Sequence, residues 1–189
     1  MLHLAQENKA DELLSANPLA LVIGLVLDQQ VPIEWAFRAP LELHNRLGDD
    51  LDACRLAALG PDKLVELFVQ KPALHRYPAV MARRVHALCS KIAAELDGDP
   101  SEIWKEASSG PELLTALKRL PGFGEQKARI FVALLGKQLG VRPLGWEKAC
   151  EPYGQAGSLR SVADIVDAAS LVKVREHKRA MKAAAHGAR

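Results

Sequence analysis

Apolar residues recur at intervals of three and four along most of this chain, which is the spacing of one face of a helix. Ala and Leu dominate, and runs with the alternating pattern of β-strands are absent. The clearest pair of such segments surrounds a glycine-rich turn: Leu113, Leu114, Leu117 and Leu120 before it, and Ala128, Phe131, Leu134, Leu135 and Leu139 after it. The pattern predicts an all-α protein in which two amphipathic helices are joined by a tight turn.

The turn between these helices reads Leu-Pro-Gly-Phe-Gly at residues 120–124. Pro121 should end the first helix, because the residue before a proline is pushed out of the α region. The glycines are expected to adopt positive φ and to let another molecule approach the backbone. Free N–H groups at the start of the second helix then form an anion site that suits phosphate. The residues expected to serve this phosphate site are Gly122, Phe123, Gly124 and the flanking cations Lys118, Arg119 and Lys127.

The same reasoning predicts the other helices. Asn17 should cap a helix over residues 18–30, with Pro18 at its first position. That helix is apolar on every side, so it should be buried, yet it ends in Asp-Gln-Gln. The other predicted helices cover residues 10–16, 33–47, 49–59, 61–68, 79–96, 101–107 and 170–185, and a capping arrangement stands at 161–164. In the last helix Leu171, Val174, Met181 and Ala185 should pack on the domain, opposite a basic stripe of Arg175, Lys178, Arg179 and Lys182.

Composition narrows the function classes. The chain has 189 residues, 49% of them hydrophobic, which suits one sizeable domain, and its net charge of +2 does not by itself indicate a polyanion partner. The three cysteines, Cys54, Cys89 and Cys150, are far apart, which argues against a disulfide framework and fits a reduced cytoplasmic setting. No histidine spacing suggests a zinc site. The longest apolar stretch, residues 19–27, is too short for a membrane span, so we expect no membrane partner.

Three stretches, in this order, resemble the HhH-GPD superfamily of DNA glycosylases: Leu-Val-Leu-Asp-Gln-Gln at 25–30, Met-Ala-Arg-Arg-Val-His-Ala-Leu at 81–88, and the turn at 120–124. The chain also looks like the small actinobacterial-type HhH-GPD base-excision repair proteins, through its DQQVPIEWAF and LPGFGEQKARIF stretches. The resemblance implies a single domain over 1–189, with two helical lobes around a cleft and a helix-hairpin-helix DNA-binding motif. One lobe would span roughly 30–135, and the other 1–29 together with 136–189.

This resemblance implies a monofunctional DNA glycosylase that acts, as a monomer, on double-stranded DNA with a damaged or mismatched base. Gln30, or Gln29 in second place, matches the residue that fills the gap left by a flipped base. Gln126 stands where bifunctional members carry a Schiff-base lysine, so lyase activity is not expected. No cofactor is implied: the four clustered cysteines of an iron–sulfur site are missing, and only a monovalent cation at the hairpin is compatible.

The catalytic carboxylate has two candidates. Glu147 is the carboxylate nearest to the position of the superfamily's catalytic aspartate, and Trp146 beside it could stack on a base. Asp28, at the end of the apolar helix, is the rival, as a general acid. Asp28 could instead be a helix-end carboxylate bonded to neighbouring backbone. Because neither position is a secure match, a non-catalytic helix-hairpin-helix protein that recognises lesions or bent DNA is the alternative function.

Overall fold

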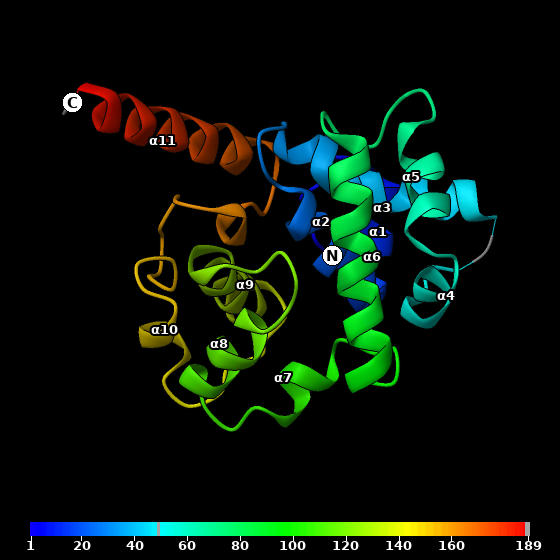
Figure 1. Cartoon of the computed structure of the whole chain (residues 1–189). Helices are drawn as coiled ribbons and strands as arrows, with labels where there is room; N and C mark the ends of the chain where they lie inside the picture. Colours follow the sequence, from blue (N-terminus) through cyan, green and yellow to red (C-terminus); the bar gives the residue numbers. More distant parts are fainter. Residues whose placement is uncertain (49, 188–189) are drawn as a thin grey trace.

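A computed structural model describes residues 1–48 and 50–187 of the chain, and it confirms the all-α prediction (Figure 1). The described residues form eleven α-helices and one 3₁₀ helix, with no strand. The helices are α1 (Asn8–Ala16), α2 (Pro18–Leu27), α3 (Ile33–Leu47), α4 (Ala53–Ala58), α5 (Pro61–Val69), α6 (Pro78–Glu95), α7 (Glu102–Glu106), α8 (Gly110–Lys118), α9 (Glu125–Gln138), α10 (Trp146–Ala149), η1 (Val162–Asp164) and α11 (Ala168–Gly187).

Helix α2 is the buried rod of the fold. The Asn17 side chain accepts a hydrogen bond from the Ala20 backbone N–H at 3.0 Å, and Pro18 takes the first helical position, as predicted. Every residue from 19 to 27 is buried. The helix ends three residues earlier than expected, because Asp28 leaves the helical conformation (φ −69°, ψ 72°) and Gln30 has a positive φ of 55°.

The helices pack in two sets around shared partners. In one set α4 and α5 lie on α6, and α1 and α2 lie on α3; in the other, α8, α10 and η1 lie on α9. Figure 1 shows the second set beside and below α2, with α11 extending away from both. In the described part of the chain no single helix is long and apolar enough to cross a membrane; α1 and α2 reach that length and composition only as a pair bent by 115°. The lobe boundaries near residues 30 and 135 stay a prediction.

The packing expected of α11 is only partly correct. Leu171 and Val174 are buried as predicted, but Met181 is 54% exposed. The Ala185 side chain lies outside the described residues. Met181 is exposed because the helix contacts η1 through its first turns and then runs beyond the rest of the molecule (Figure 1). Helical periodicity identifies the apolar face of a helix, but it does not say how far a neighbour extends along it.

A buried ion pair ties the C-terminal segment to α9. The Lys137 ammonium contacts a carboxylate oxygen of Asp164 at 2.6 Å, and their side chains are only 16% and 4% exposed. Asp164 also accepts hydrogen bonds from the backbone N–H of Arg160 and of Ser161, which is the predicted capping arrangement at the start of η1. Ser158 completes the shell with its hydroxyl. The pair therefore holds the loop before η1 against α9.

Replacing Lys137 with Met should lower the free energy of unfolding by about 3 kcal/mol, because it leaves a buried carboxylate without its cation. Chemical denaturation measures this loss. The matched control is Lys63→Met, since Lys63 makes only a surface ion pair with Glu66 and should cost less than about 1 kcal/mol. Equal losses in the two variants would contradict the assignment.

Candidate functional site

The polar end of α2 is where most of the predicted site residues meet. A helix ends with four backbone carbonyls that lack partners within the helix. Here Lys127 of α9 donates from Nζ to the carbonyls of Leu25 and Val26, at 2.6 Å each. The Asp28 N–H donates to the carbonyl of Gly24 at 3.0 Å, and the Gln29 N–H to that of Leu27 at 2.7 Å. All four carbonyls are therefore satisfied.

Lys127 is turned inward, and this corrects the expectation that it flanks an outward-facing phosphate site. Burial lowers the pKa of its ammonium to about 8, although the nearby Asp28 carboxylate raises it; Arg84 and Lys178 lower it further. At neutral pH the group is still mostly charged. A cation at the negative end of the α2 dipole, beside a carboxylate, is favourably placed. Its position in α9 was predicted correctly, but its direction was not.

Gln29 is held on both sides of its amide. Its Nε2 donates to the Val26 carbonyl at 2.9 Å, and its Oε1 accepts from Arg84 of α6 at 3.1 Å. The ring of His75 contacts the Gln29 carbonyl through Nε2 at 3.0 Å, and its Nδ1 accepts from the Tyr77 N–H, also at 3.0 Å. Because Nδ1 accepts, Nε2 carries the proton and the ring is neutral. The Gln29 side chain thus connects the turn to α2 and α6 through hydrogen bonds.

Gln30 differs from Gln29 in the exposure of its side chain and in its backbone conformation. Its side chain is exposed, and its backbone φ of 55° lies in the left-handed region that residues other than glycine rarely adopt. Such conformations persist where the surroundings impose them and are concentrated at functional sites. Of the two glutamines, the structure leaves Gln30 as the one whose amide faces outward.

Asp28 lines an open groove of about 580 Å³ between this turn and α11. Its side chain is 14% exposed, and one carboxylate oxygen lies 3.7 Å from Nζ of Lys178, too far for a hydrogen bond. Arg175 of α11 is paired with Glu34 of α3. The groove is lined by Asp28, Gln29, Gln30, Val31, Pro32 and Ile33 on one side and by Arg175, Lys178 and Arg179 on the other. It brings the Asp28 carboxylate opposite three cations, of which Arg175 is already paired with Glu34.

The turn between α8 and α9 packs against this same end of α2. Gly122 has a φ of 89°, and a Cβ there would lie 3.1 Å from the Val26 side chain and 3.3 Å from that of Arg84. Phe123 is buried and contacts Phe131 edge to face, with ring centroids 5.7 Å apart. Gly124 has a φ of −83°, so the expectation of positive φ is wrong there. A Cβ at Gly124 would meet open space.

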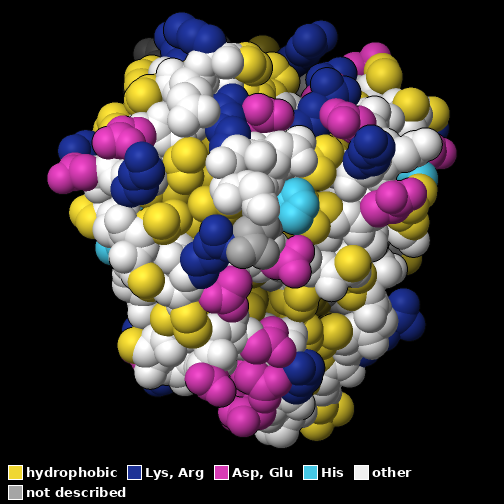
Figure 2. All heavy atoms as spheres, turned by 90° about the vertical axis from the view of Figure 1, so that its right-hand side faces the viewer, with side chains coloured by type: hydrophobic (Ala, Val, Ile, Leu, Met, Phe, Trp, Pro, Cys, Tyr) yellow, Lys and Arg dark blue, Asp and Glu magenta, His cyan; other side chains and the backbone are white. Residues whose placement is uncertain are grey.

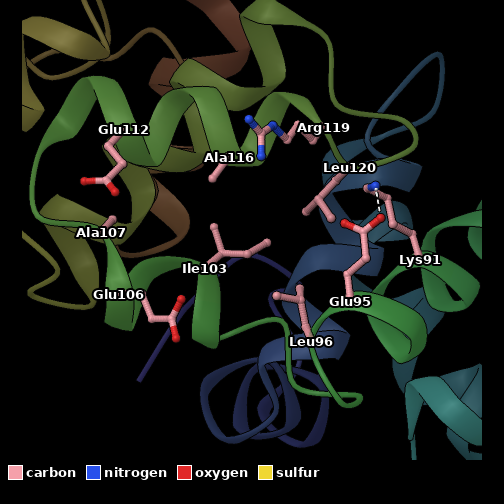
Figure 3. A pocket seen from close by; sticks show the side chains of 10 residues that line it. All are labelled: Lys91, Glu95, Leu96, Ile103, Glu106, Ala107, Glu112, Ala116, Arg119 and Leu120. Carbon is pink, nitrogen blue, oxygen red and sulfur yellow. Dashed lines mark hydrogen bonds and ion pairs between the residues drawn. The ribbon is translucent and has the colours of Figure 1, made fainter.

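The cations expected beside this turn are differently engaged. Lys118 pairs with Glu125 at the start of α9, and Glu125 also accepts from Arg129 at 2.8 Å. Arg119 is exposed and lies at a cavity of about 220 Å³ that Figure 3 shows, with carboxylates around apolar side chains. The full lining of that cavity is Lys91, Glu95, Leu96, Ile103, Glu106, Ala107, Glu112, Ala116, Arg119 and Leu120. Three carboxylates against two cations do not favour a phosphate in this cavity.

The remaining predicted residues lie apart from the groove. Glu147 is exposed in α10, which packs on α8 and α9. The Trp146 ring covers Gly136 of α9 so closely that a Cβ there would lie 2.3 Å from it, and it does not line the groove of Asp28. Gln126 is exposed in the first turn of α9 and donates to the Tyr153 hydroxyl at 3.1 Å. Of the two candidate carboxylates, only Asp28 is brought together with the glutamines.

Surface charge is unevenly distributed. Figure 2 shows acidic side chains gathered at the lower end of one face, the end where Figure 1 places α7, and a mixture of both signs above them. Residues 95–106 supply five Asp or Glu and one Lys. A polyanion would be repelled from this end.

Comparison with protein-family models, with curated proteins and with solved structures found no match. Among the described residues, no group of three or more His, Cys, Asp or Glu side chains is arranged to hold a metal ion. The monovalent cation considered for the hairpin stays a prediction.

Two residues of this site were missed in the sequence. Arg84 lies in the 81–88 stretch used for the resemblance, but nothing local distinguishes it from Arg83. His75 is 1% exposed, and no periodic pattern surrounds it because it lies in a loop. Both act through side-chain bonds to a turn far away in the chain. Contacts between residues so far apart in the chain can be predicted from sequence only when the two positions covary among related proteins.

Burial lowers the pKa of His75 below its usual 6.5, although its bonds to backbone carbonyls oppose the shift. The folded protein then binds the proton less readily than the unfolded chain, so the stability from the neutral ring is complete above pH 6.5 and decreases as the pH falls below it. His75→Gln keeps an Nε2–H donor without this titration. Between pH 7.5 and 5.5 the wild type should lose more unfolding free energy than the variant, by denaturant titration. Parallel losses would show that His75 does not titrate in this way.

Proposed function

We propose that the protein is a monofunctional DNA glycosylase of base-excision repair that acts on double-stranded DNA with a damaged or mismatched base. The observation that supports this most is the packing of the α8–α9 turn against the polar end of α2. This packing puts Gly122 against Val26, four residues before the exposed Gln30, and so supports a joint role for the predicted phosphate anchor and Gln30. In this proposal α8, the turn and α9 are the helix-hairpin-helix motif, and the two sets of helices are the lobes.

The hairpin would hold a DNA phosphate through backbone N–H groups. Gly124 supports this role, because the space beside it is open and a phosphate oxygen could come close to the start of α9. Glu125 follows directly, but Lys118 and Arg129 both neutralise it. Contacts of this kind bind any duplex and carry no base information.

Base recognition would take place at the turn. Gln30 would enter the gap in the duplex, where its amide can both donate and accept hydrogen bonds. The flipped nucleotide would occupy the groove beside Asp28. As the bond from base to sugar breaks, the base would leave with the bonding electrons and take up a proton from solvent, while the Asp28 carboxylate would stabilise the cationic sugar and accept a proton from the attacking water. Lys178 lies 3.7 Å from the carboxylate, so it would balance the charge of Asp28 as an ion pair without engaging it in a hydrogen bond.

Replacing Gly124 with Ala should weaken binding to every duplex by roughly tenfold, whatever its sequence, because the methyl group keeps the phosphate away from the helix start. The protein itself should accept Ala: φ is −83° and the space is open, so unfolding should cost at most about 1 kcal/mol. Fluorescence anisotropy on two unrelated duplexes measures the effect. A variant with unchanged affinity, or with a changed lesion preference only, would contradict the phosphate role.

Asp28→Asn should abolish excision of the preferred base, whereas Glu147→Gln should leave the rate within about twofold, because only Asp28 lines the groove. The measurement is the appearance of alkali-labile sites across a panel of deaminated, oxidised and alkylated duplexes.

No covalent adduct between protein and DNA should be trapped by borohydride, since Gln126 offers no amine.

A reversed ranking of the two variants would assign the chemistry to Glu147. Duplex binding by a wild-type protein that excises nothing on the panel would favour the alternative, a non-catalytic lesion-binding protein.

A further inference from the structure

Two contacts connect the hairpin to the end of α2. One is the close approach of Gly122 to the Val26 side chain. The other is the Lys127 ammonium, which reaches from the first turn of α9 to the carbonyls of Leu25 and Val26. Lys127 lies one helical turn after Gly124, close to the start of α9 where a phosphate would bind, but its side chain points to α2. Its ammonium therefore fixes the start of α9 relative to the end of α2.

We propose that Lys127 is a positioning residue, which locks the turn at residues 28–30 to the hairpin so that a phosphate bound at the hairpin places Gln30 at the gap left by a missing base. The inference rests on the proposed function, since it assigns a role in the same DNA contact. Lys127 does not touch DNA in this arrangement. It acts through the backbone carbonyls that it holds.

The conformation of Gln30 needs such a restraint. A left-handed residue other than glycine is unfavourable and is kept only where its surroundings determine it. The Val26 carbonyl is shared by Lys127 and by the amide of Gln29, whose other end is held by Arg84. Without the ammonium, the Val26 carbonyl would accept a hydrogen bond only from the Gln29 amide. The Leu25 carbonyl would accept only from the Asp28 N–H, at 3.2 Å.

The charge of Lys127 matters as well as its hydrogen bonds. The last carbonyls of α2 present the negative end of a helix dipole, and the Asp28 carboxylate adds a full negative charge nearby. Arg84 and Lys178 are the other cations around this point. Removing one buried cation from this group should loosen the turn more than the loss of a surface lysine does.

A double-mutant cycle between Lys127→Met and Gln30→Ala tests the inference. The probe is a duplex that carries a tetrahydrofuran analogue of an abasic site, compared with the same duplex intact. Each single variant should reduce the preference for the abasic-site duplex over the intact duplex roughly tenfold. The double variant should lose no more of this preference than either single variant. Affinity for the intact duplex should stay within about twofold, because the hairpin is unchanged.

Lys127→Arg, which restores the charge and the donors, should recover most of the preference, and Lys63→Met serves as the matched control with no effect. Amide hydrogen exchange at Asp28 and Gln29 should accelerate in Lys127→Met and not in the control. Losses that multiply in the double variant, equal weakening on both duplexes, or unchanged exchange would each overturn the positioning role. A wild-type protein that binds neither duplex would overturn the proposed function, while the exchange result would still decide whether Lys127 holds the turn.

Discussion

The site depends on how the C-terminal end of a buried helix is satisfied. Helix α2 is apolar from its first turn to its last, so its final carbonyls lie where water cannot serve all of them. One lysine from α9 supplies two of the missing hydrogen bonds and a positive charge. This contact requires α9 to start beside α2. That position depends on the tight turn between α8 and α9, where Gly122 approaches Val26 closely.

Electrostatics follow from the same arrangement. Asp28 begins the polar segment after α2, with Lys127 of α9 and Lys178 of α11 near it, and Arg84 of α6 is a further cation close to Lys127. The excess of positive charge suits an anionic ligand, while the single carboxylate suits a developing cation within that ligand. In the proposed function, a nucleotide whose sugar becomes cationic would combine both demands. The acidic end of the molecule, near α7, lacks this combination (Figure 2).

The two adjacent glutamines show how one turn can separate structural and exposed roles. Gln29 uses its amide inside the protein, between Val26 and Arg84. This fixes the backbone from which Gln30 extends, at a φ that a free turn would avoid. A rigid base for an exposed polar side chain reduces the entropy lost when that side chain binds.

Much of this fold could be predicted from the sequence alone. Periodicity and capping residues, such as Asn17 before α2, predicted most helices closely, because these signals act within a few residues. The burial of α2 and the capping box at Ser161 have the same local origin. Grouping Asp28 with the glutamines needed no more than adjacency in the chain.

The tertiary structure decided which way long side chains point and how far neighbours extend. Lys127 turns to carbonyls that lie about a hundred positions earlier in the chain, and Met181 is exposed because this part of α11 runs beyond the packed helices. Asp28 meets α11, whereas Glu147 does not line that groove. Contacts of this kind depend on the packing of whole helices, which local patterns do not encode, because a lysine stem can follow several directions from the same backbone.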